Sequence, residues 1–254
     1  MAVIVFGKMK SSPSISVVVP AYNEEKNIEA TVGEILAAVN GRFLDYELLL
    51  VDDGSKDKTG QIADALASKN SNIRVIHNNG NKGFGYSYEA GVRAAKCDYI
   101  AFFPSDNCVP SSSMGNVFDK IGRADIVLNY TSNLDVRPPI RQFLSKLYTR
   151  IINLAFKTHF TNINGPTIHR RKIIQSLNMT THGFAFMAEI MIKLTLSGNS
   201  YTEVGTPIRE RQYGEVKAFK CKNVISVFRT IASLYYEIKI KNRRQYNKKP
   251  LRIF

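Results

Sequence analysis

Residues 98–110 (DYIAFFPSDNCVP) carry the side chains best suited to chemistry. The segment opens with a short apolar and aromatic run, which is typical of a buried parallel strand that ends in a polar loop. In an open α/β fold such a loop lies at the carboxyl edge of the sheet, where ligands bind. Asp106, with Asn107 beside it, could hold a divalent cation there through oxygen ligands. Alternatively, the two residues only form an Asx turn.

Two other predicted strands end in acidic loops. Residues 20–24 follow the β-branched run 15–19, and residues 52–55 follow the run 46–51. Because parallel strands end at the same edge of a sheet, these loops are predicted to lie side by side. Asp52 or Asp53 could accept a hydrogen bond from a nucleobase or a ribose hydroxyl. Tyr22 is either a stacking partner for a base or a buried side chain.

Three further features could bind or balance charge. The Gly-rich loop 79–85 could let backbone N–H groups approach a phosphate, although such loops usually only turn the chain. Arg209, Arg211 and Lys217 gather around a turn, which suits either a diphosphate clamp or a solvated charged loop. Glu189 lies in an apolar helix, where a carboxylate is costly unless it is paired. A basic partner or a polar cavity is therefore expected beside it.

These residues require a scaffold of alternating strands and helices. Strands are predicted at 15–19, 46–51, 73–77, 99–103 and 125–129, with a further short strand within 162–171. Helices are predicted at 24–40 (with Asn23 as N-cap), 56–69, 86–95, 111–121, 140–156 and 183–196. The alternation predicts right-handed βαβ units and an α/β fold with a mostly parallel sheet flanked by helices.

The predicted helix 140–156 follows a break at Pro138-Pro139 and is amphipathic. One interpretation is a helix that faces the core and exposes its basic side to solvent. The other is a helix that lies in a membrane interface with its cations near lipid phosphates. The apolar stripe comprises Phe143, Leu144, Leu147, Ile151 and Leu154, and the basic residues are Arg141, Lys146 and Arg150.

Composition limits the possible partners. The 254 residues carry a formal charge of +14, which favours an anionic partner such as a phosphorylated substrate, a membrane surface or nucleic acid. No nucleic-acid reader motif accompanies the charge, so nucleic acid is not expected as the main partner. Cys97, Cys108 and Cys221 have no metal-ligand spacing and indicate free thiols in a reducing compartment. No apolar run is long enough to span a bilayer. The basic tail 237–252 is expected to be mobile.

With these residues in view, the chain resembles inverting glycosyltransferases of family 2 with the GT-A fold. Within that family it most resembles the dolichyl- or polyprenyl-phosphate mannose and glucose synthases. The matching segments occur in the family's order: VVVPAYNEEKNI, LLVDDGSKDKT, NKGFGYSYEAG, PIRQFLSKLYTRIINLAF, NGPTIHRRKI, GFAFMAEIMIK and RQYGEVK. Two positions depart from the family. Pro104 replaces the first Asp of the D-x-D metal motif, and Thr167 stands where the family usually has Arg.

The resemblance implies roles for particular residues. Catalytic roles fall to Asp106, Arg211 and Glu189, and a Mg²⁺ or Mn²⁺ ion would be held by Asp106. The nucleotide would be bound by Pro20, Tyr22, Glu24, Val51, Asp52, Asp53, Lys82, Ser105 and Lys217. The acceptor would be bound by Arg141, Ser145 and Arg170.

The resemblance also implies an organisation and an activity. Residues 1–13 would be an N-terminal extension, 14–218 a GT-A domain with a nucleotide half (14–110) and an acceptor half (111–218), and 219–254 a C-terminal helix and basic tail. The expected reaction transfers a sugar from a nucleotide diphosphate sugar to a polyprenyl or dolichyl phosphate, with inversion. The expected location is cytoplasmic, at the inner face of a membrane. Two alternatives remain: transfer to a saccharide hydroxyl, or a nucleotide-binding membrane partner without turnover.

Overall fold

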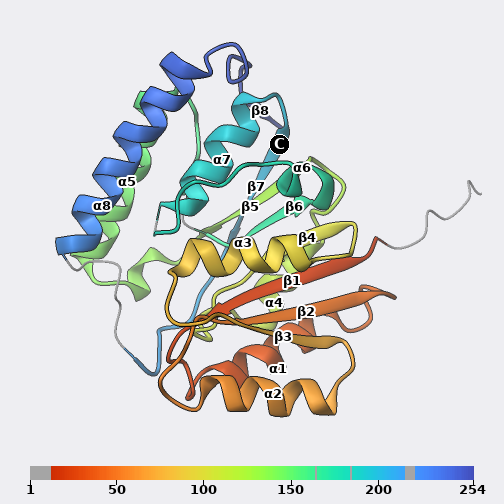
Figure 1. The fold of residues 1–254 in the computed structure, drawn as a ribbon. Coiled ribbons are helices and arrows are strands. Elements are labelled where there is room, and N and C mark those ends of the chain that lie inside the picture. The colour runs from red at the N-terminus through yellow and green to blue at the C-terminus, as the bar shows by residue number, and fades with distance from the viewer. Residues whose placement is uncertain (1–12, 164, 184, 215–220) are drawn as a thin grey trace, which may run out of the picture.

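The apolar runs of the sequence form one central sheet (Figure 1). The computed structural model describes residues 13–163, 165–183, 185–214 and 221–254. Within these residues the spatial order of the strands is β3 (Ile73–His77), β2 (Tyr46–Asp52), β1 (Ile15–Ala21), β4 (Tyr99–Phe102), β6 (Thr167–Arg170), β5 (Ile126–Thr131), β7 (Ser200–Thr206) and β8 (Leu251–Arg252). Neighbouring strands are parallel except around β6, which runs antiparallel to β4 and β5. The predicted α/β fold with a mostly parallel sheet is confirmed.

Helices cover both faces of the sheet because successive strand residues point to opposite sides. One face packs against α1 (Ile28–Val39), α2 (Thr59–Lys69) and α4 (Ser111–Phe118). The other packs against α3 (Phe84–Ala94), α5 (Pro139–Phe156), α6 (Arg171–Gln175), α7 (Phe186–Leu196) and α8 (Cys221–Tyr236). Val17 and Val18 illustrate the division, since each is fully buried in a different one of the two cores.

Several helices begin later than predicted, and Asn23 is not an N-cap. Asn23 adopts a left-handed conformation with φ 55°, and α1 begins only at Ile28. The side chain of Asn23 instead accepts a hydrogen bond from the backbone N–H of Lys56 at 2.8 Å. Hydrogen bonding between the two loops therefore engages the side chain that local propensity assigns to a helix cap. Likewise, α2 begins at Thr59 and α7 at Phe186.

The expectation of a mobile C-terminal tail is wrong. After α8 the chain forms a π-helical turn, η3 (Glu237–Lys241), and then β8, which pairs with β7. Two ion pairs hold this segment: Glu237 to Lys193 at 2.9 Å and Arg252 to Glu203 at 2.7 Å. A helix that could span a bilayer is not found among the described residues.

Candidate active site

The carboxyl ends of β1, β2 and β4 meet at one edge of the sheet. In the strand register Pro20 lies beside Val51, and Ala21 beside Asp52. Val18 lies beside Phe102, so the loop that contains Ser105 and Asp106 leaves β4 at the same edge. The edge therefore brings together the three loops that the sequence indicates.

Hydrogen bonds fasten the first two loops to each other. The N–H of Asn23 donates to Ser55 Oγ at 3.0 Å, and the N–H of Glu24 donates to Thr59 Oγ1 at 2.8 Å. The predicted side-by-side arrangement of these loops is confirmed. Tyr22, the first residue after β1, is half-buried.

Asp53 organises the Gly-rich loop. Its buried carboxylate accepts hydrogen bonds from Asn78 Nδ2 and from the N–H groups of Lys82 and Gly83, each at 2.9 Å. Two N–H groups of a loop that could have faced a phosphate thus face a carboxylate of the protein. The side chain of Lys82 is exposed at the edge, where it remains available to an anion.

Asp52 is also engaged. It accepts a hydrogen bond from the N–H of Ser55 and lies 3.2 Å from Nδ1 of His77, whose Nε2 is 3.0 Å from Asp64. The pKa of His77 is raised, mainly by its hydrogen bond to Asp64 and then by Asp52, which together outweigh the opposing effect of burial. A cationic imidazole here would offset the charge of Asp52.

Arg211 joins the nucleotide-side loop to the loop after β4. Its Nη2 donates to Glu24 Oε1 at 2.6 Å and to Oε2 at 2.8 Å. Its Nη1 lies 3.7 Å from Asp106 Oδ2. Asn27 Nδ2 donates to the same carboxylate of Glu24 at 2.6 Å. The structure thus brings Arg211, Glu24 and Asp106 together, and the Arg211 side chain is only 18% exposed.

The segment that carries Arg211 crosses the edge after β7 and is held along its length. The side-chain amide of Asn133 donates to the carbonyl of Ile208 and accepts from the N–H of Ile208, at 2.9 Å each. The N–H of Arg209 donates to the carbonyl of Cys108 at 2.8 Å, and its guanidinium lies 2.6 Å from Glu34. Arg209 is therefore committed to a structural ion pair, while Arg211 faces the edge.

Arg137 is a residue that sequence reasoning missed. Its Nε atom is buried and has no hydrogen-bond partner among the described residues. Burial lowers the pKa of Arg137, and the nearby Arg141 lowers it further against the attraction of Cys108 and Asp106. Burial and the charge of Asp106 raise the pKa of the Cys108 thiol to about 12, against the opposing effects of Arg211 and Arg141. Three guanidinium groups therefore act on the surroundings of Asp106. The sequence signal was an Arg immediately before the Pro-Pro break.

Ser145 and Arg170, also assigned to the acceptor, lie in different parts of the structure. Ser145 lies one helical turn after Arg141 on α5, and its Oγ accepts a hydrogen bond from Asn162 at 3.1 Å. Arg170 pairs in register with Tyr99, at the amino end of β4, and forms an ion pair with Asp125 at 3.1 Å. Because β6 is antiparallel, Thr167 is the residue at the ligand-binding edge. The assignment of Arg170 to the acceptor is therefore corrected.

Glu189 is fully buried and has a basic partner. Its carboxylate lies 2.6 Å from Lys193 Nζ and accepts hydrogen bonds from Thr180 and Thr181. Burial raises the pKa of Glu189, but Lys193 and the Thr180 hydroxyl lower it more, so the carboxyl stays ionised. The basic partner that the sequence indicated is Lys193, and the carboxylate of Glu189 has no exposed surface. Lys217 lies outside the described residues.

The loop after β4 offers oxygen ligands that fit a divalent cation. Asn107, at φ 55°, has a buried side-chain oxygen without a hydrogen-bond partner in the described part of the chain. Asp106 beside it is 24% exposed. No cluster of three or more His, Cys, Asp or Glu side chains among the described residues could hold a metal unaided. This donor set matches a Mg²⁺ site completed by substrate phosphates, since Mg²⁺ commonly takes one or two carboxylates.

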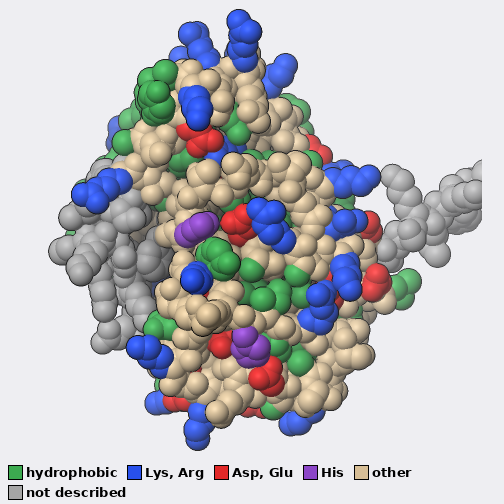
Figure 2. All heavy atoms as spheres, in the orientation of Figure 1, with side chains coloured by type: hydrophobic (Ala, Val, Ile, Leu, Met, Phe, Trp, Pro, Cys, Tyr) green, Lys and Arg blue, Asp and Glu red, His purple; other side chains and the backbone are tan. Residues whose placement is uncertain are grey.

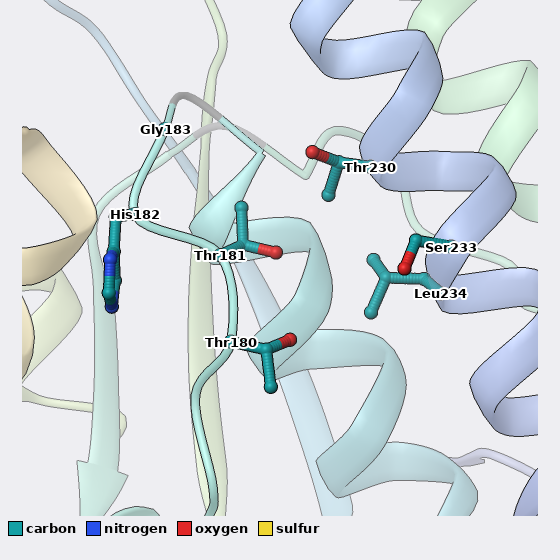
Figure 3. Close-up of a pocket in the computed structure, with 7 residues that line it drawn as sticks. All are labelled: Thr180, Thr181, His182, Gly183, Thr230, Ser233 and Leu234. Carbon is teal, nitrogen blue, oxygen red and sulfur yellow. The ribbon is translucent and has the colours of Figure 1, made fainter.

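A separate polar cavity lies beside α8 (Figure 3). It measures about 250 Å³ and is lined on one side by the loop of Thr180, Thr181 and His182, and on the other by residues of α8. The labelled hydroxyl groups come from both walls (Figure 3). Its lining residues are distinct from those around Asp106.

Comparison with known proteins agrees with this arrangement. Residues 16–190 match the profile described as "Glycosyl transferase family 2". A glycosyltransferase, GlyG, of Streptococcus pneumoniae is 33% identical over 49% of this chain and 41% of its own length. The dolichol-phosphate mannosyltransferase of Pyrococcus furiosus is 28% identical over 87% of this chain and 63% of its own length. The chain thus spans less than two thirds of either relative. An undecaprenyl-phosphate mannosyltransferase of Micrococcus luteus is 25% identical over 79% of this chain and 85% of its own.

The fold has solved counterparts. Glucosyl-3-phosphoglycerate synthase of Mycobacterium tuberculosis, crystallised with Mn²⁺, UDP and phosphoglyceric acid, superimposes with a TM-score of 0.69 over 89% of this chain and 78% of that one, at 20% identity. A second crystal structure of this synthase, with Mg²⁺ and UDP, gives a TM-score of 0.66. From the profile match, the sheet topology and these superpositions, the chain belongs to glycosyl transferase family 2 and has the GT-A fold.

Proposed function

We propose that the protein transfers a sugar from a nucleotide diphosphate sugar to a polyprenyl phosphate, with inversion at the anomeric carbon. The observation that carries the proposal is the position of Arg211, bound to Glu24 and 3.7 Å from Asp106, with Arg137 and Arg141 acting on the same surroundings. A site with this excess of guanidinium groups suits two phosphorylated substrates. Two relatives of the chain are named as polyprenol-phosphate mannosyltransferases.

The donor would lie along the edge formed by the loops after β1, β2 and β4. UDP occupies the solved structural counterparts, which supports a nucleotide at this edge. Tyr22, Asp52 and Ser105 line the edge, and the exposed Lys82 side chain would reach the donor's phosphates. Asp53 would act indirectly, because its carboxylate is occupied in holding the Gly-rich loop.

The chemical step is a single displacement. A phosphate oxygen of the acceptor forms a bond to the anomeric carbon while the bond from that carbon to the diphosphate oxygen breaks. The electron pair leaves with the nucleotide diphosphate. Arg211 would stabilise the negative charge that develops on the leaving group. When bound, a divalent cation held by Asp106 and Asn107 would supply further positive charge to that diphosphate.

The acceptor phosphate needs positioning more than it needs a base. A phosphate monoester has a second pKa of about 6, so it is mostly dianionic at neutral pH. Arg137 and Arg141 would hold it, with Ser145 one turn further along α5. Among the described carboxylates near this edge, Asp106 has the most exposed surface for a base, at 24%. Glu24 and Asp52 are 11 and 10% exposed and are engaged by Arg211 and His77, and Glu189 is fully buried in its ion pair. This distribution favours a phosphate acceptor over a saccharide hydroxyl, which would need a base. A lipid-linked acceptor implies work at a membrane surface, and we propose the cytoplasmic face.

The test is transfer of label into a lipid product. Purified protein is incubated with radiolabelled GDP- and UDP-sugars, polyprenyl phosphate, and Mg²⁺ or Mn²⁺, and label is extracted into organic solvent. We expect label from one donor and its loss in Asp106→Ala. Asp119→Ala is the matched control, because Asp119 is an exposed acid whose partner is Arg42 on the surface. Nucleotide binding without lipid label from any donor would contradict the proposal and favour a hydroxyl acceptor or a protein without turnover.

A further inference from the structure

One face of α5 exposes a row of large apolar side chains. Ile140, Phe143, Leu147 and Leu154 are 65, 59, 41 and 73% exposed. At 100° per residue they fall within an arc of about 60° on the helix surface. We name these four residues the α5 stripe. Three of them belong to the apolar pattern that one interpretation assigned to the core. The helix does pack against the core, but through Thr149, Ile152 and Phe156, so these three side chains remain exposed.

The end of α8 and η3 expose further large apolar side chains near the end of α5. Tyr235, Tyr236 and Ile240 are 45, 58 and 61% exposed. The ring of Tyr235 packs against Phe156, the last residue of α5, with the centroids 6.1 Å apart. Figure 1 shows the two helices running together at one end of the molecule. More than half of the large apolar side chains that the described residues expose lie on these elements.

The charge around this surface has one sign. The sequence of α5 contains Arg141, Lys146 and Arg150 and no acidic residue. In residues 229–254 the only acid is Glu237, and it is paired with the buried Lys193. Figure 2 shows Lys and Arg side chains gathered at the end of the molecule where the C-terminal segment lies.

We propose that the α5 stripe, with the exposed residues of α8 and η3, is a docking surface for an anionic lipid bilayer. Apolar side chains flanked by Lys and Arg are the pattern by which helices lie in a membrane interface. Tyrosine rings favour the depth of the lipid headgroups. A second copy of the chain is a poorer occupant, because a two-fold interface would bring the same cations face to face.

The surface leads directly to the candidate active site. Ile140 and Phe143 lie in the first turns of α5, on either side of Arg141, and Arg137 is two residues before the helix. A phosphate headgroup at the bilayer surface would therefore meet the guanidinium groups near Asp106. This second step rests on the proposed function, whereas docking itself does not.

Sedimentation with vesicles tests the docking surface. Vesicles of phosphatidylcholine with phosphatidylglycerol are compared with phosphatidylcholine alone. We expect the protein to bind the anionic vesicles, and the variant Phe143→Ser/Leu147→Ser/Leu154→Ser to bind about tenfold or more weakly. Leu44→Ser is the matched control, because Leu44 is 90% exposed and lies between α1 and β2. A second variant, Lys146→Gln/Arg150→Gln, should lose the preference for anionic vesicles.

Two results would overturn the proposal. One is a folded triple variant, judged by circular dichroism and thermal unfolding, that binds anionic vesicles as tightly as the native protein. The other is a triple variant that loses self-association in light scattering while its vesicle binding is unchanged, which would assign the stripe to a second copy. Transfer to a short, water-soluble prenyl phosphate separates this inference from the proposed function. The triple variant should keep that activity and lose activity on acceptor embedded in vesicles.

Discussion

The guanidinium of Arg211 is bound to both carboxylate oxygens of Glu24, at 2.6 and 2.8 Å. The pair links the loop after the first strand to the segment after β7, across 187 positions of the sequence. Both side chains are largely buried, with 18 and 11% of their surface exposed. Both contacts come from one nitrogen, Nη2, and charge-assisted hydrogen bonds to a largely buried carboxylate hold the guanidinium in place. Its remaining face is directed to Asp106, where the donor diphosphate is expected.

Replacing Arg211 by Gln should reduce catalysis strongly. The change removes the charge proposed to stabilise the leaving diphosphate and also unties Glu24. Loss of one such electrostatic contact typically lowers kcat on the order of 100-fold. The measurement is kcat/KM with the donor that the lipid-transfer assay identifies. Arg211→Lys should recover part of the activity, because it restores charge without the two-pronged contact. Equal activity in Arg211→Gln and the native protein would remove Arg211 from the mechanism.

Replacing Arg137 by Gln should weaken acceptor binding. The Nε of Arg137 is buried without a hydrogen-bond partner in the described part of the chain, and Arg141 is nearby, an arrangement that is costly unless an anion balances it. We expect KM for the polyprenyl phosphate to rise about tenfold while kcat changes little, as for a contact made equally in ground and transition states. Arg123→Gln, at an exposed turn before β5, is the control. A rise confined to the KM of the donor would instead assign Arg137 to the diphosphate.

How much of the fold and of the site could be predicted depends on how far apart in sequence the interacting residues lie. The continuous apolar runs specified β1 and β2 well, because strands buried on both faces are recognised by composition alone. The need of Glu189 for a cation was also predictable, and Lys193 lies one helical turn away. The direction of β6 was not, since a short apolar run carries no signal for parallel or antiparallel pairing. That direction moved Arg170 to the far edge of the sheet and left Thr167 at the near one.

Long-range contacts limited the prediction of the site itself. Asn23 has the residue type of a helix cap, but its side chain is used by Lys56, 33 positions away. Asp53 has the residue type of a nucleotide ligand, but its oxygens are used by the Gly-rich loop. In both cases the residue type has the expected local propensity, but a hydrogen-bond partner distant in sequence occupies the side chain. Arg137 was missed for the converse reason, because its burial follows from packing rather than from its neighbours in sequence.

Asp53→Asn should loosen the Gly-rich loop. The amide cannot accept from Asn78, Lys82 and Gly83 as the carboxylate does, and hydrogen bonds to a charged group contribute about 1.5–3 kcal/mol. We expect a loss of about 2 kcal/mol in the free energy of unfolding and a higher KM for the donor. Denaturant unfolding and steady-state kinetics measure the two effects. Asp64→Asn is the control, because its side chain is 60% exposed and His77 keeps Asp52. A stable Asp53→Asn protein with a raised donor KM would mean that Asp53 contacts the nucleotide directly.

The buried cluster of Lys193, Glu189 and Glu237 should dominate the stability of the α7 region. Lys193→Met leaves Glu189 buried without its cation, and breaking a buried pair in this way costs about 3–5 kcal/mol. Lys172→Met, at an exposed position on α6, should cost little and serves as control. The double variant Lys193→Met/Glu189→Gln should recover much of the loss, because no fully buried charge is left without a partner. Glu237 also loses Lys193, but its side chain is 24% exposed and can be hydrated. Chemical denaturation at neutral pH gives the three values.

The pH dependence of this loss distinguishes charge from packing. In the native protein, burial raises the folded-state pKa of Glu189, but Lys193 and Thr180 lower it by more. The stability that the ionised Glu189 contributes is therefore present above the unfolded pKa of about 4.3 and is lost as the pH falls through the folded-state pKa. Without Lys193, burial should raise the folded pKa instead, and the variant then gains stability relative to the native protein as Glu189 takes up a proton. The difference between native and Lys193→Met proteins should therefore narrow between neutral pH and about pH 4. A constant difference across that range would show that the loss comes from packing around the Lys193 side chain rather than from its charge.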